Sequence, residues 1–353
     1  MKALILTGGQ GTRLRPFTCS TPKPLLPLAN IPFLEHQFHL LRRHGFREVT
    51  LATAYKPEGF RKAFGDGRAF GLKLSYAYEK TPLGTGGGVR NGCPDPRETL
   101  LVLNGDVLQD LDLSAFLRFH RAHKAEASIV LIRVKDPTPY GLVELDAKKR
   151  IRRFLEKPPP EEITTDTINA GTYLLEPSAL LRIPRGEIYS MERGLFPSLL
   201  QAERPFYGFT TEGYWADIGT LEKYLQTHLD LLLGIAPLRV KGLRKKGPFF
   251  LEAGTKPPKP GTHEGEGGAL LGRGTRVDPS ARLRGCVCLG RDCVVGPQAV
   301  LEDCVLLDGC RVSAGARLTR CIIGRGCRIG ECSVVGPGRA LGDRTTLTEY
   351  SAA

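Results

Sequence analysis

A glycine-rich segment near the N-terminus carries the residues with the most informative chemistry. It follows the apolar run Ala3 to Leu6 and is therefore expected to be a loop at the end of a first strand. Arg13 adds a rigid cationic fork, and Lys23 adds a second, more mobile positive charge. Three glycines leave backbone N–H groups open to a bulky anion: Gly8, Gly9 and Gly11. The combination predicts a phosphate-binding loop for a nucleoside triphosphate.

The spacing of this segment excludes two common phosphate-binding patterns. Gly8 to Pro16 fits neither the P-loop pattern GxxxxGK(S/T) nor the dinucleotide pattern GxGxxG. Together with Lys23 and Pro24, it resembles instead the signature of the sugar-1-phosphate nucleotidyltransferases, which join a nucleotide to a sugar phosphate and release pyrophosphate. Thr7 stands where that family usually has alanine, a change expected to be harmless. For the motif alone, the alternative is a glycine-rich strand-to-helix turn with an incidental surface arginine.

The resemblance implies nucleotide contacts from two glycine-rich segments. The second segment, Leu83 to Gly88, resembles the base-binding loop of the family, where missing side chains would let the backbone approach a flat base. Alone it is a weak signal, because any tight loop can be rich in glycine. The nucleotide-binding residues implied by the resemblance are Gly8, Gly9, Gly11, Thr12, Arg13, Gly84 and Thr85.

Two aspartates are candidate metal ligands. The apolar run Leu100 to Leu103 leads into Asn104-Gly105-Asp106, which delivers a carboxylate to the tip of a strand. Asp217 lies far downstream in Trp215 to Leu225, where the resemblance continues, although the family usually has proline in place of Leu221. By resemblance, both aspartates bind the catalytic Mg²⁺, an ion that favours one or two carboxylates with phosphate oxygens and water. For either aspartate alone, a capping or turn role is an equal alternative.

Three further segments resemble the sugar-binding part of the family: Phe154 to Pro158, Tyr140 to Val143 and Asn169 to Tyr173. The first matches the EKP motif, from which Glu156 would contact sugar hydroxyls and Lys157 the sugar phosphate. Taken alone, this pair is more simply two solvated surface charges. The sugar-phosphate-binding residues implied by the resemblance are Gly141, Glu156, Lys157 and Asn169. The matches follow the family's order over almost all of residues 1–225.

These residues lead to a hypothesis of direct displacement, in which a sugar-1-phosphate oxygen attacks the α-phosphorus of the nucleotide and pyrophosphate leaves. Catalysis would then rest on positioning and on neutralising charge. The resemblance implies catalytic roles for Arg13, Lys23, Asp106 and Asp217, with Mg²⁺ as the cofactor. The details of the motifs are most similar to mannose-1-phosphate guanylyltransferases, which would use GTP and mannose-1-phosphate, and to related heptose-phosphate enzymes.

Other functions remain open at this stage. Uridylyl and thymidylyl transferases for glucose-1-phosphate share the same framework. A regulatory, non-catalytic subunit would have the same two domains, although the complete set of charged residues argues against it. Acetylation of amino sugars by the C-terminal part is disfavoured, because the similar bifunctional enzymes use a histidine base and no histidine follows His263.

The order of strand-like and helix-like segments indicates an α/β fold for residues 1–234, with a mostly parallel, Rossmann-like sheet and helices on both faces. Pro32 to His44 places Leu34, Phe38 and Leu41 on one helical face and ends at Gly45, which suits a helix C-terminus. In such folds ligands bind beyond the carboxyl ends of the strands. The strand candidates include Glu48 to Thr53, Leu72 to Tyr78, Thr99 to Leu103 and Ser128 to Val134.

Residues 235–268 are rich in proline and glycine and are expected to be a connector. A repeat domain follows at residues 269–350, where aliphatic residues recur every six positions. This period suits a parallel β-helix and resembles the left-handed β-helix of hexapeptide-repeat proteins. Cys286 and Cys304 are expected to stack in neighbouring coils. The aliphatic positions are Leu271, Val277, Leu283, Leu289, Val295, Leu301 and Leu307, then Ile323, Ile329, Val335, Leu341 and Leu347.

Composition limits the class of partner. The 353 residues carry a net charge of +13, which suits polyanionic substrates, nucleic acid or an anionic membrane surface. The basic residues are mostly dispersed, and Arg244 to Lys246, the one dense cluster, is expected to be a solvated linker, so no nucleic-acid partner is expected. Without a long apolar stretch or a signal peptide, we expect no membrane partner and a cytoplasmic location. Of the 10 cysteines, all but Cys19 and Cys93 lie between Cys286 and Cys332 and are expected to fill the narrow interior of the β-helix. The β-helix is expected to mediate homo-oligomer formation.

Overall fold

The computed structural model describes residues 1–237 and 239–353. Their contacts divide the chain into two compact units. Unit 1 comprises Met1–Gly9 and Gln37–Trp215, and unit 2 comprises Gln10–His36 and Ala216–Ala353. The segment Gln10–His36 therefore packs with the C-terminal part of the chain. The domain boundaries expected at residues 234 and 268 stay predictions.

Unit 1 contains a nine-stranded sheet in the order β10-β9-β11-β6-β1-β4-β5, with β8 paired to β11 and β12 paired to β8. The neighbours β6-β1-β4-β5 run parallel, whereas β11 runs antiparallel to β6 and β8. The expected strands are confirmed to within about one residue. The strands are β1 (Lys2–Leu6), β4 (Glu48–Thr53), β5 (Lys73–Tyr78), β6 (Leu100–Asn104), β8 (Ala127–Arg133), β9 (Gly141–Leu145), β10 (Ile151–Glu156), β11 (Thr167–Leu175) and β12 (Phe206–Thr210).

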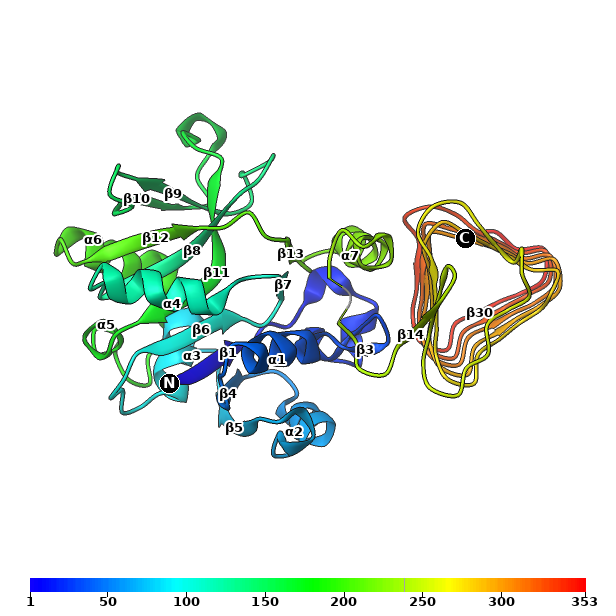
Figure 1. The fold of residues 1–353 in the computed structure, drawn as a ribbon, viewed down its shortest axis with the longest axis horizontal. Helices are drawn as coiled ribbons and strands as arrows, with labels where there is room; N and C mark the ends of the chain where they lie inside the picture. Colours follow the sequence, from blue (N-terminus) through cyan, green and yellow to red (C-terminus); the bar gives the residue numbers. More distant parts are fainter. Residues whose placement is uncertain (238) are drawn as a thin grey trace. The chain divides into compact units, whose positions relative to one another are not determined.

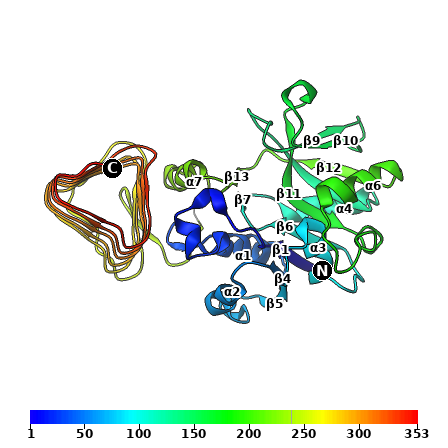
Figure 2. The same cartoon turned by 180° about the vertical axis from the view of Figure 1, so that it is seen from behind.

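Both faces of this sheet are covered. Ala3, Leu4 and Ile5 of β1 are all fully buried, and successive side chains of a strand point to opposite faces. Helix α3 packs on β1, β4 and β5, and helix α4 packs on β8 and β12, as can be followed in Figures 1 and 2. The α-helices in the described ranges are α1 (Phe33–Arg43), α2 (Pro57–Phe64), α3 (Gly84–Gly92), α4 (Leu113–Ala122), α5 (Pro177–Leu180), α6 (Phe196–Gln201) and α7 (Leu221–Leu233).

Helix α1 confirms the expected amphipathic segment. Leu34, Phe38 and Leu41 are buried, as their helical spacing predicted. Gly45 follows the helix with a φ of 83°, and its N–H donates to the Arg42 carbonyl at 3.1 Å. The left-handed backbone at this glycine ends the helix as expected.

Unit 2 contains a parallel β-helix with three sheets, drawn as a triangular stack of coils in Figure 1. Apart from the antiparallel first strand β14, neighbouring strands in each sheet run parallel and come from successive coils, as in a left-handed β-helix. The first sheet has β14 (Arg244–Lys246), β15 (Phe249–Leu251), β17 (Ala269–Leu271), β20 (Val287–Leu289), β23 (Val305–Leu306), β26 (Ile322–Ile323) and β29 (Ala340–Leu341). The second has β16 (His263–Glu264), β19 (Arg282–Arg284), β22 (Val300–Glu302), β25 (Arg317–Thr319) and β28 (Val334–Val335). The third has β18 (Arg276–Val277), β21 (Val294–Val295), β24 (Arg311–Val312), β27 (Arg328–Ile329) and β30 (Thr346–Leu347).

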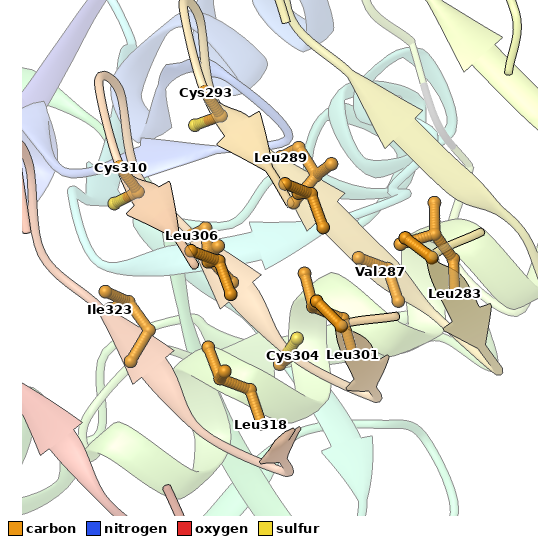
Figure 3. Close-up of a cluster of buried hydrophobic side chains, with 14 of the residues drawn as sticks. Leu283, Val287, Leu289, Cys293, Leu301, Cys304, Leu306, Cys310, Leu318 and Ile323 are labelled. Carbon is orange, nitrogen blue, oxygen red and sulfur yellow. The ribbon is translucent and has the colours of Figure 1, made fainter. Parts of the chain in front are cut away.

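Columns of aliphatic side chains fill the interior of the β-helix. Figure 3 shows one column formed by Leu283, Leu301 and Leu318 and another by Leu289, Leu306 and Ile323. The expected inward position of Leu307 is wrong, because Leu289 lies opposite Leu306 instead. This side of the coil is one residue shorter than a strict six-residue period requires.

The same shift changes the stacking of the cysteines. Cys288 lies opposite Val305, which places Val287 rather than Cys286 beside Cys304, so the expected stacking of Cys286 on Cys304 is wrong. Cys286 instead faces α7, where its thiol donates to the Leu229 carbonyl at 3.7 Å. Cys332 is exposed. The cysteines that do fill the interior are Cys293, Cys304, Cys310, Cys321 and Cys327.

The expected connector, residues 235–268, contains strands of the β-helix. Phe249 and Leu251 of β15 are buried, and β15 pairs in parallel with β17. Arg244 to Lys246 are exposed, as expected of a charged cluster, but they form β14, which pairs with β15 in antiparallel fashion. Within the two described ranges, no helix has the length and apolar character that crossing a membrane requires.

Candidate active site

The first part of the glycine-rich segment, in unit 1, is open. A Cβ atom added to Gly9 would meet no atom within 4 Å, and one added to Gly8 would lie 3.5 Å from the Ala54 side chain. Thr7 is buried, and its hydroxyl donates to the Ala52 carbonyl at 2.8 Å. The hydroxyl that replaces the family's usual alanine is therefore satisfied.

The second part, in unit 2, folds into short 3-10 turns. Gly11 has a φ of 63°, and the Thr18 hydroxyl donates to its carbonyl at 2.8 Å. A Cβ at Gly11 would come within 3.0 Å of the Thr18 Cγ2 and 3.1 Å of the Lys23 Cβ, so the glycine lets both side chains pack closely against it. Thr12 and Arg13 are exposed at the turn η1 (Thr12–Leu14), while Lys23 is half-buried at the turn η3 (Lys23–Leu25).

Asp217 and Arg13 come together in unit 2 around Gly219. An added Cβ at Gly219 would lie 2.8 Å from Asp217 Oδ2 and 3.2 Å from Arg13 Nη2. Lys223 Nζ lies 2.5 Å from Asp217 Oδ1. Asp217 ends β13 (Trp215–Asp217), and the Thr220 hydroxyl caps α7 by accepting from the Lys223 N–H at 3.3 Å. Sequence reasoning missed Lys223, although it lies inside the matched Trp215 to Leu225 segment.

Asp106 lies in a tight turn of unit 1 after β6. The Gly105 N–H donates to the Leu6 carbonyl at 2.8 Å, and a Cβ at Gly105 would come within 2.5 Å of that oxygen. Only glycine therefore lets the turn approach the end of β1 so closely. Gln37 fixes the same turn by donating to the carbonyls of Asn104 and Val107 at 2.7 and 2.8 Å. Asp106 is thus held, half-buried, beside the carboxyl end of β1.

Glu156 and Gly141 are brought together by the antiparallel pairing of β10 with β9. A Cβ at Gly141 would lie 2.9 Å from Glu156 Oε2, so this glycine leaves room beside the carboxylate. Burial, followed by the nearby Glu192 carboxylate, raises the pKa of Glu156. Lys157 is largely exposed, has a φ of 52°, and places its Nζ 3.9 Å from Glu156 Oε1.

This raised pKa leads to a prediction about stability and activity. The pKa of Glu156 is higher in the folded than in the unfolded protein. The folded protein is therefore most stable at a pH below the unfolded-state pKa, and it loses stability as the pH rises through the folded-state pKa. Glu156→Gln removes the charge, so its urea midpoint at pH 7 should equal or exceed that of the wild type. We expect kcat/KM for the sugar phosphate to fall by about 10- to 100-fold, as for a lost hydrogen bond to a charged group.

Urea unfolding at pH 5 and pH 8, with steady-state kinetics, checks this prediction. The control is Glu162→Gln, since Glu162 is exposed and pairs with Arg153 at 3.1 Å. A Glu156→Gln variant with wild-type kinetics would remove this residue from the proposed sugar site.

Asn169 is tied into the end of β11 by its own side chain. Its Nδ2 donates to the Tyr173 hydroxyl at 3.0 Å, and its Oδ1 accepts from the Gly171 N–H at 2.9 Å. Gly171 has a φ of 75° and packs against Asn104, the residue that precedes the Asp106 turn. The amide orientation of Asn169 is thereby fixed next to the strand that carries the metal-ligand candidate.

The glycine-rich segment at Gly84 forms helix α3, so the expected loop is wrong. The glycines serve an internal packing role, because a Cβ at Gly84 or Gly86 would collide with Tyr189 at 2.8 or 2.7 Å. The N–H groups of Gly86 and Gly87 both donate to the Tyr189 carbonyl. The helix is therefore joined directly to the segment that precedes α6.

Thr85 at the start of α3 contacts a carboxylate that sequence reasoning missed. The Thr85 hydroxyl donates to Glu192 Oε2 at 2.6 Å and accepts from the Met191 N–H at 2.9 Å. The Ser190 hydroxyl also donates to Glu192 Oε2, at 2.8 Å. The Glu192 carboxylate also helps to raise the pKa of Glu156. No motif marks Glu192 in the sequence.

The donor chemistry of the two aspartates fits Mg²⁺. Across the described residues, no cluster of three or more histidine, cysteine, aspartate or glutamate side chains could hold a metal ion. Mg²⁺ does not need such a cluster, because it takes one or two carboxylates and completes its shell with phosphate oxygens and water. Asp106 lies two residues after the end of β6 and Asp217 ends β13, so each carboxylate is presented near a strand terminus.

Comparison with known proteins decides the family. The family model described as nucleotidyl transferase matches residues 2–233. The chain belongs to the nucleotidyl transferase family. A second family model, described as the GMPPB C-terminal domain, matches residues 266–351 of this nucleotidyltransferase.

Curated relatives cover both parts of the chain. The mannose-1-phosphate guanylyltransferase of Mycobacterium tuberculosis is 42% identical over 320 residues, covering 90% of this chain and 83% of the relative. The UTP–glucose-1-phosphate uridylyltransferase of Synechocystis is 32% identical, covering 93% of this chain and 88% of the relative. The crystal structure of HddC from Yersinia pseudotuberculosis complexed with GMP-PN is 28% identical, with a TM-score of 0.56, and covers 64% of this chain and 97% of that one. This nucleotidyltransferase is accordingly a sugar-1-phosphate nucleotidyltransferase.

Proposed function

We propose that this nucleotidyltransferase joins GTP and mannose-1-phosphate into GDP-mannose and releases pyrophosphate. The observation that carries the proposal is the 42% identity to the mycobacterial mannose-1-phosphate guanylyltransferase over 90% of the chain. The mannose-1-phosphate guanylyltransferase 1 of Arabidopsis thaliana, 37% identical over 93% of this chain, adds support. The match to the cyanobacterial uridylyltransferase makes UTP and glucose-1-phosphate the second candidate pair.

The chemistry is a direct displacement. An oxygen of mannose-1-phosphate forms a bond to the α-phosphorus of GTP, and the bond from that phosphorus to the bridging oxygen of pyrophosphate breaks. The attacking oxygen is already ionised at neutral pH, so no general base is required. The barrier is the repulsion between two polyanions, which Arg13, Lys23 and Lys157 would reduce by binding phosphate oxygens. The exposure of Arg13 and Lys157 leaves both cations accessible to a substrate.

Mg²⁺ is the proposed cofactor, held by Asp106 and Asp217. When bound, it would supply positive charge to the phosphate oxygens of the nucleotide. Lys223 orients the Asp217 carboxylate through the 2.5 Å contact, and Gly105 sets the position of Asp106.

The remaining substrate contacts are assigned to the two glycine-rich segments and to the segments that resemble the family's sugar-binding part. The open backbone at Gly8 and Gly9, with Gly11 and Thr12, would receive the triphosphate. Gly84 and Thr85 would lie near the base, at the N-terminus of α3. Gly141, Glu156 and Asn169 would contact the sugar, since Gly141 leaves space beside Glu156.

Assembly and location are also proposals. We propose that the β-helix mediates homo-oligomer formation, because its flat faces and open end offer surfaces for a second copy. The cytoplasmic location stays a prediction. A non-catalytic regulatory role is disfavoured, because Arg13, Asp217 and Lys223 form an ordered charged cluster that a regulator would not need.

Substrate specificity tests the proposal. Pyrophosphate release is measured with Mg²⁺ for GTP, UTP, dTTP, CTP and ATP, each with mannose-1-phosphate and with glucose-1-phosphate. We expect the GTP and mannose-1-phosphate pair to have a kcat/KM at least about tenfold above every other pair, as for a difference of one or two base contacts. A preference for UTP and glucose-1-phosphate would overturn the proposal, and release with no pair would favour the regulatory role.

A further inference from the structure

The segment Gln10–His36 has little regular structure of its own. Arg13 and Lys23 lie on short 3-10 turns, and a third such turn covers Phe17–Cys19. The hairpin of β2 (Pro27–Leu28) and β3 (Ile31–Pro32) follows, and α1 begins at Phe33. Its internal hydrogen bonds are mostly local, such as those from the Leu14 N–H to the Gly11 carbonyl at 2.9 Å and from the Leu26 N–H to the Lys23 carbonyl at 3.0 Å. The position of the whole segment therefore also depends on what it packs against. In unit 2 it packs against the β-helix and α7.

The late coils of the β-helix contact the turn between Arg13 and Lys23. The Ser20 hydroxyl donates to Asp343 Oδ2 at 3.3 Å, and Arg325 Nη1 donates to Thr21 Oγ1 at 3.2 Å. Asp343 Oδ1 also accepts from the Arg325 N–H at 2.9 Å, so the two coil residues hold each other. A Cβ at Gly342 would lie 3.3 Å from the Pro16 ring, which shows how closely the backbones approach.

A second contact lies at the tip of the hairpin. Ala29 and Asn30 both have positive φ, of 50° and 65°, as in a two-residue hairpin turn. Asn30 Nδ2 donates to the Leu289 carbonyl at 2.8 Å, and the Cys288 thiol donates to Asn30 Oδ1 at 3.5 Å. Both polar atoms of the Asn30 side chain are therefore used by strand β20 of the β-helix.

Helix α7 connects the same scaffold to Asp217. The buried Tyr224 hydroxyl donates to the Pro27 carbonyl of the hairpin. The α7 carbonyl of Leu229 accepts from the Cys286 thiol. Helix α7 begins at Leu221, four residues after Asp217. The contacts of Tyr224 and Leu229 therefore hold α7 against the hairpin and the β-helix, and with it the segment that carries Asp217.

We propose that the β-helix is a positioning element for catalysis, in which Arg325, Asp343 and the β20 strand hold the segment that carries Arg13 and Lys23. This inference rests on the proposed phosphate-binding roles of these two cations. It gives the repeat domain a function within its own chain, separate from assembly. Arg325 acts through Thr21 and is therefore a positioning residue.

The test compares Arg325→Met with Arg328→Met in the full-length protein. Arg328 is an exposed arginine of β27, and within the described ranges its side chain has no hydrogen bond or ion pair to residues 10–36. We expect Arg325→Met to speed amide hydrogen exchange in peptides from residues 10–36 by about fivefold, as for one lost hydrogen bond. The expected fall in kcat/KM for GTP is of the same size, with a melting temperature equal to that of Arg328→Met.

A double-mutant cycle sharpens the assignment. Thr21→Val removes the acceptor from the other side of the contact, so it should reproduce the kinetic loss, and Arg325→Met/Thr21→Val should add nothing further. Equal exchange and kinetics for Arg325→Met and Arg328→Met would overturn the inference. Faster exchange with unchanged kcat/KM would overturn it as well. Absence of wild-type turnover would count against the proposed function, whereas the exchange difference would still support the structural part of this inference.

Discussion

Asp106→Asn should lower kcat by about 10²- to 10³-fold, the size of effect seen when one preorganised electrostatic contact to the reacting phosphate is lost. The substitution keeps the shape of the side chain but removes the charge that Mg²⁺ binds. Asp106 lies in a turn fixed by the Gly105 N–H and the Gln37 side chain, which donate to backbone carbonyls. The fold and melting temperature are therefore expected to be unchanged.

Asp110→Asn is the matched control, because Asp110 lies four positions further along and pairs with Arg43 at 2.9 Å. Turnover is measured over a titration of Mg²⁺ for both variants. Asp106→Asn should require more Mg²⁺ and still not recover the wild-type rate, whereas Asp110→Asn should behave as the wild type. A near-normal rate for Asp106→Asn at saturating Mg²⁺ would remove Asp106 from the metal site.

Arg13→Ala should have the second large effect, a fall in kcat of about 10³-fold, comparable to removing an arginine that neutralises charge in phosphoryl transfer. The Arg13 guanidinium lies beside Gly219 and Asp217, so it is presented to the same place as the second metal-ligand candidate. Charge develops on the leaving pyrophosphate in the transition state, and the loss should therefore appear in kcat more than in KM for GTP.

Arg15→Ala provides the comparison, since Arg15 is exposed two residues later in the same segment. Steady-state kinetics with varied GTP separate kcat from KM for both variants. Arg13→Lys should recover only part of the rate, because an ammonium cannot reproduce the fork geometry of a guanidinium. Equal rates for Arg13→Ala and Arg15→Ala would show that Arg13 is an ordinary surface arginine.

Local patterns in the sequence were sufficient for most secondary structure. Glu48 to Thr53 is a strand with the predicted bounds, and the helix at Pro32 to His44 differs by one residue at each end. The register of the β-helix strands was harder to predict from the sequence. A strict six-residue period predicts Leu307 as the inward residue, but hydrogen bonding between coils selects Leu306. Only the strand pairing between neighbouring coils shows that this side of the coil is one residue shorter than six.

The candidate site residues also divide into those that local sequence predicts and those that it does not. Asp106 is of the first kind, because the apolar strand and Gly105 before it predict a turn at the strand end. Lys223 and Glu192 were missed because their importance comes from a partner, Asp217 in one case and Thr85 in the other. Ser20 and Asp343 are 323 positions apart in the sequence, so no local pattern predicts their contact.

Following the phosphorus atoms tests direct nucleotidyl transfer. The purified protein is incubated with Mg²⁺, GTP and mannose-1-phosphate, and the products are observed by ³¹P nuclear magnetic resonance. Direct nucleotidyl transfer predicts GDP-mannose and pyrophosphate in equal amounts, with no exchange of labelled pyrophosphate into GTP when mannose-1-phosphate is left out. Pyrophosphate exchange without the sugar phosphate would indicate a nucleotidyl-enzyme intermediate and would contradict direct displacement, while release of inorganic phosphate alone would contradict nucleotidyl transfer.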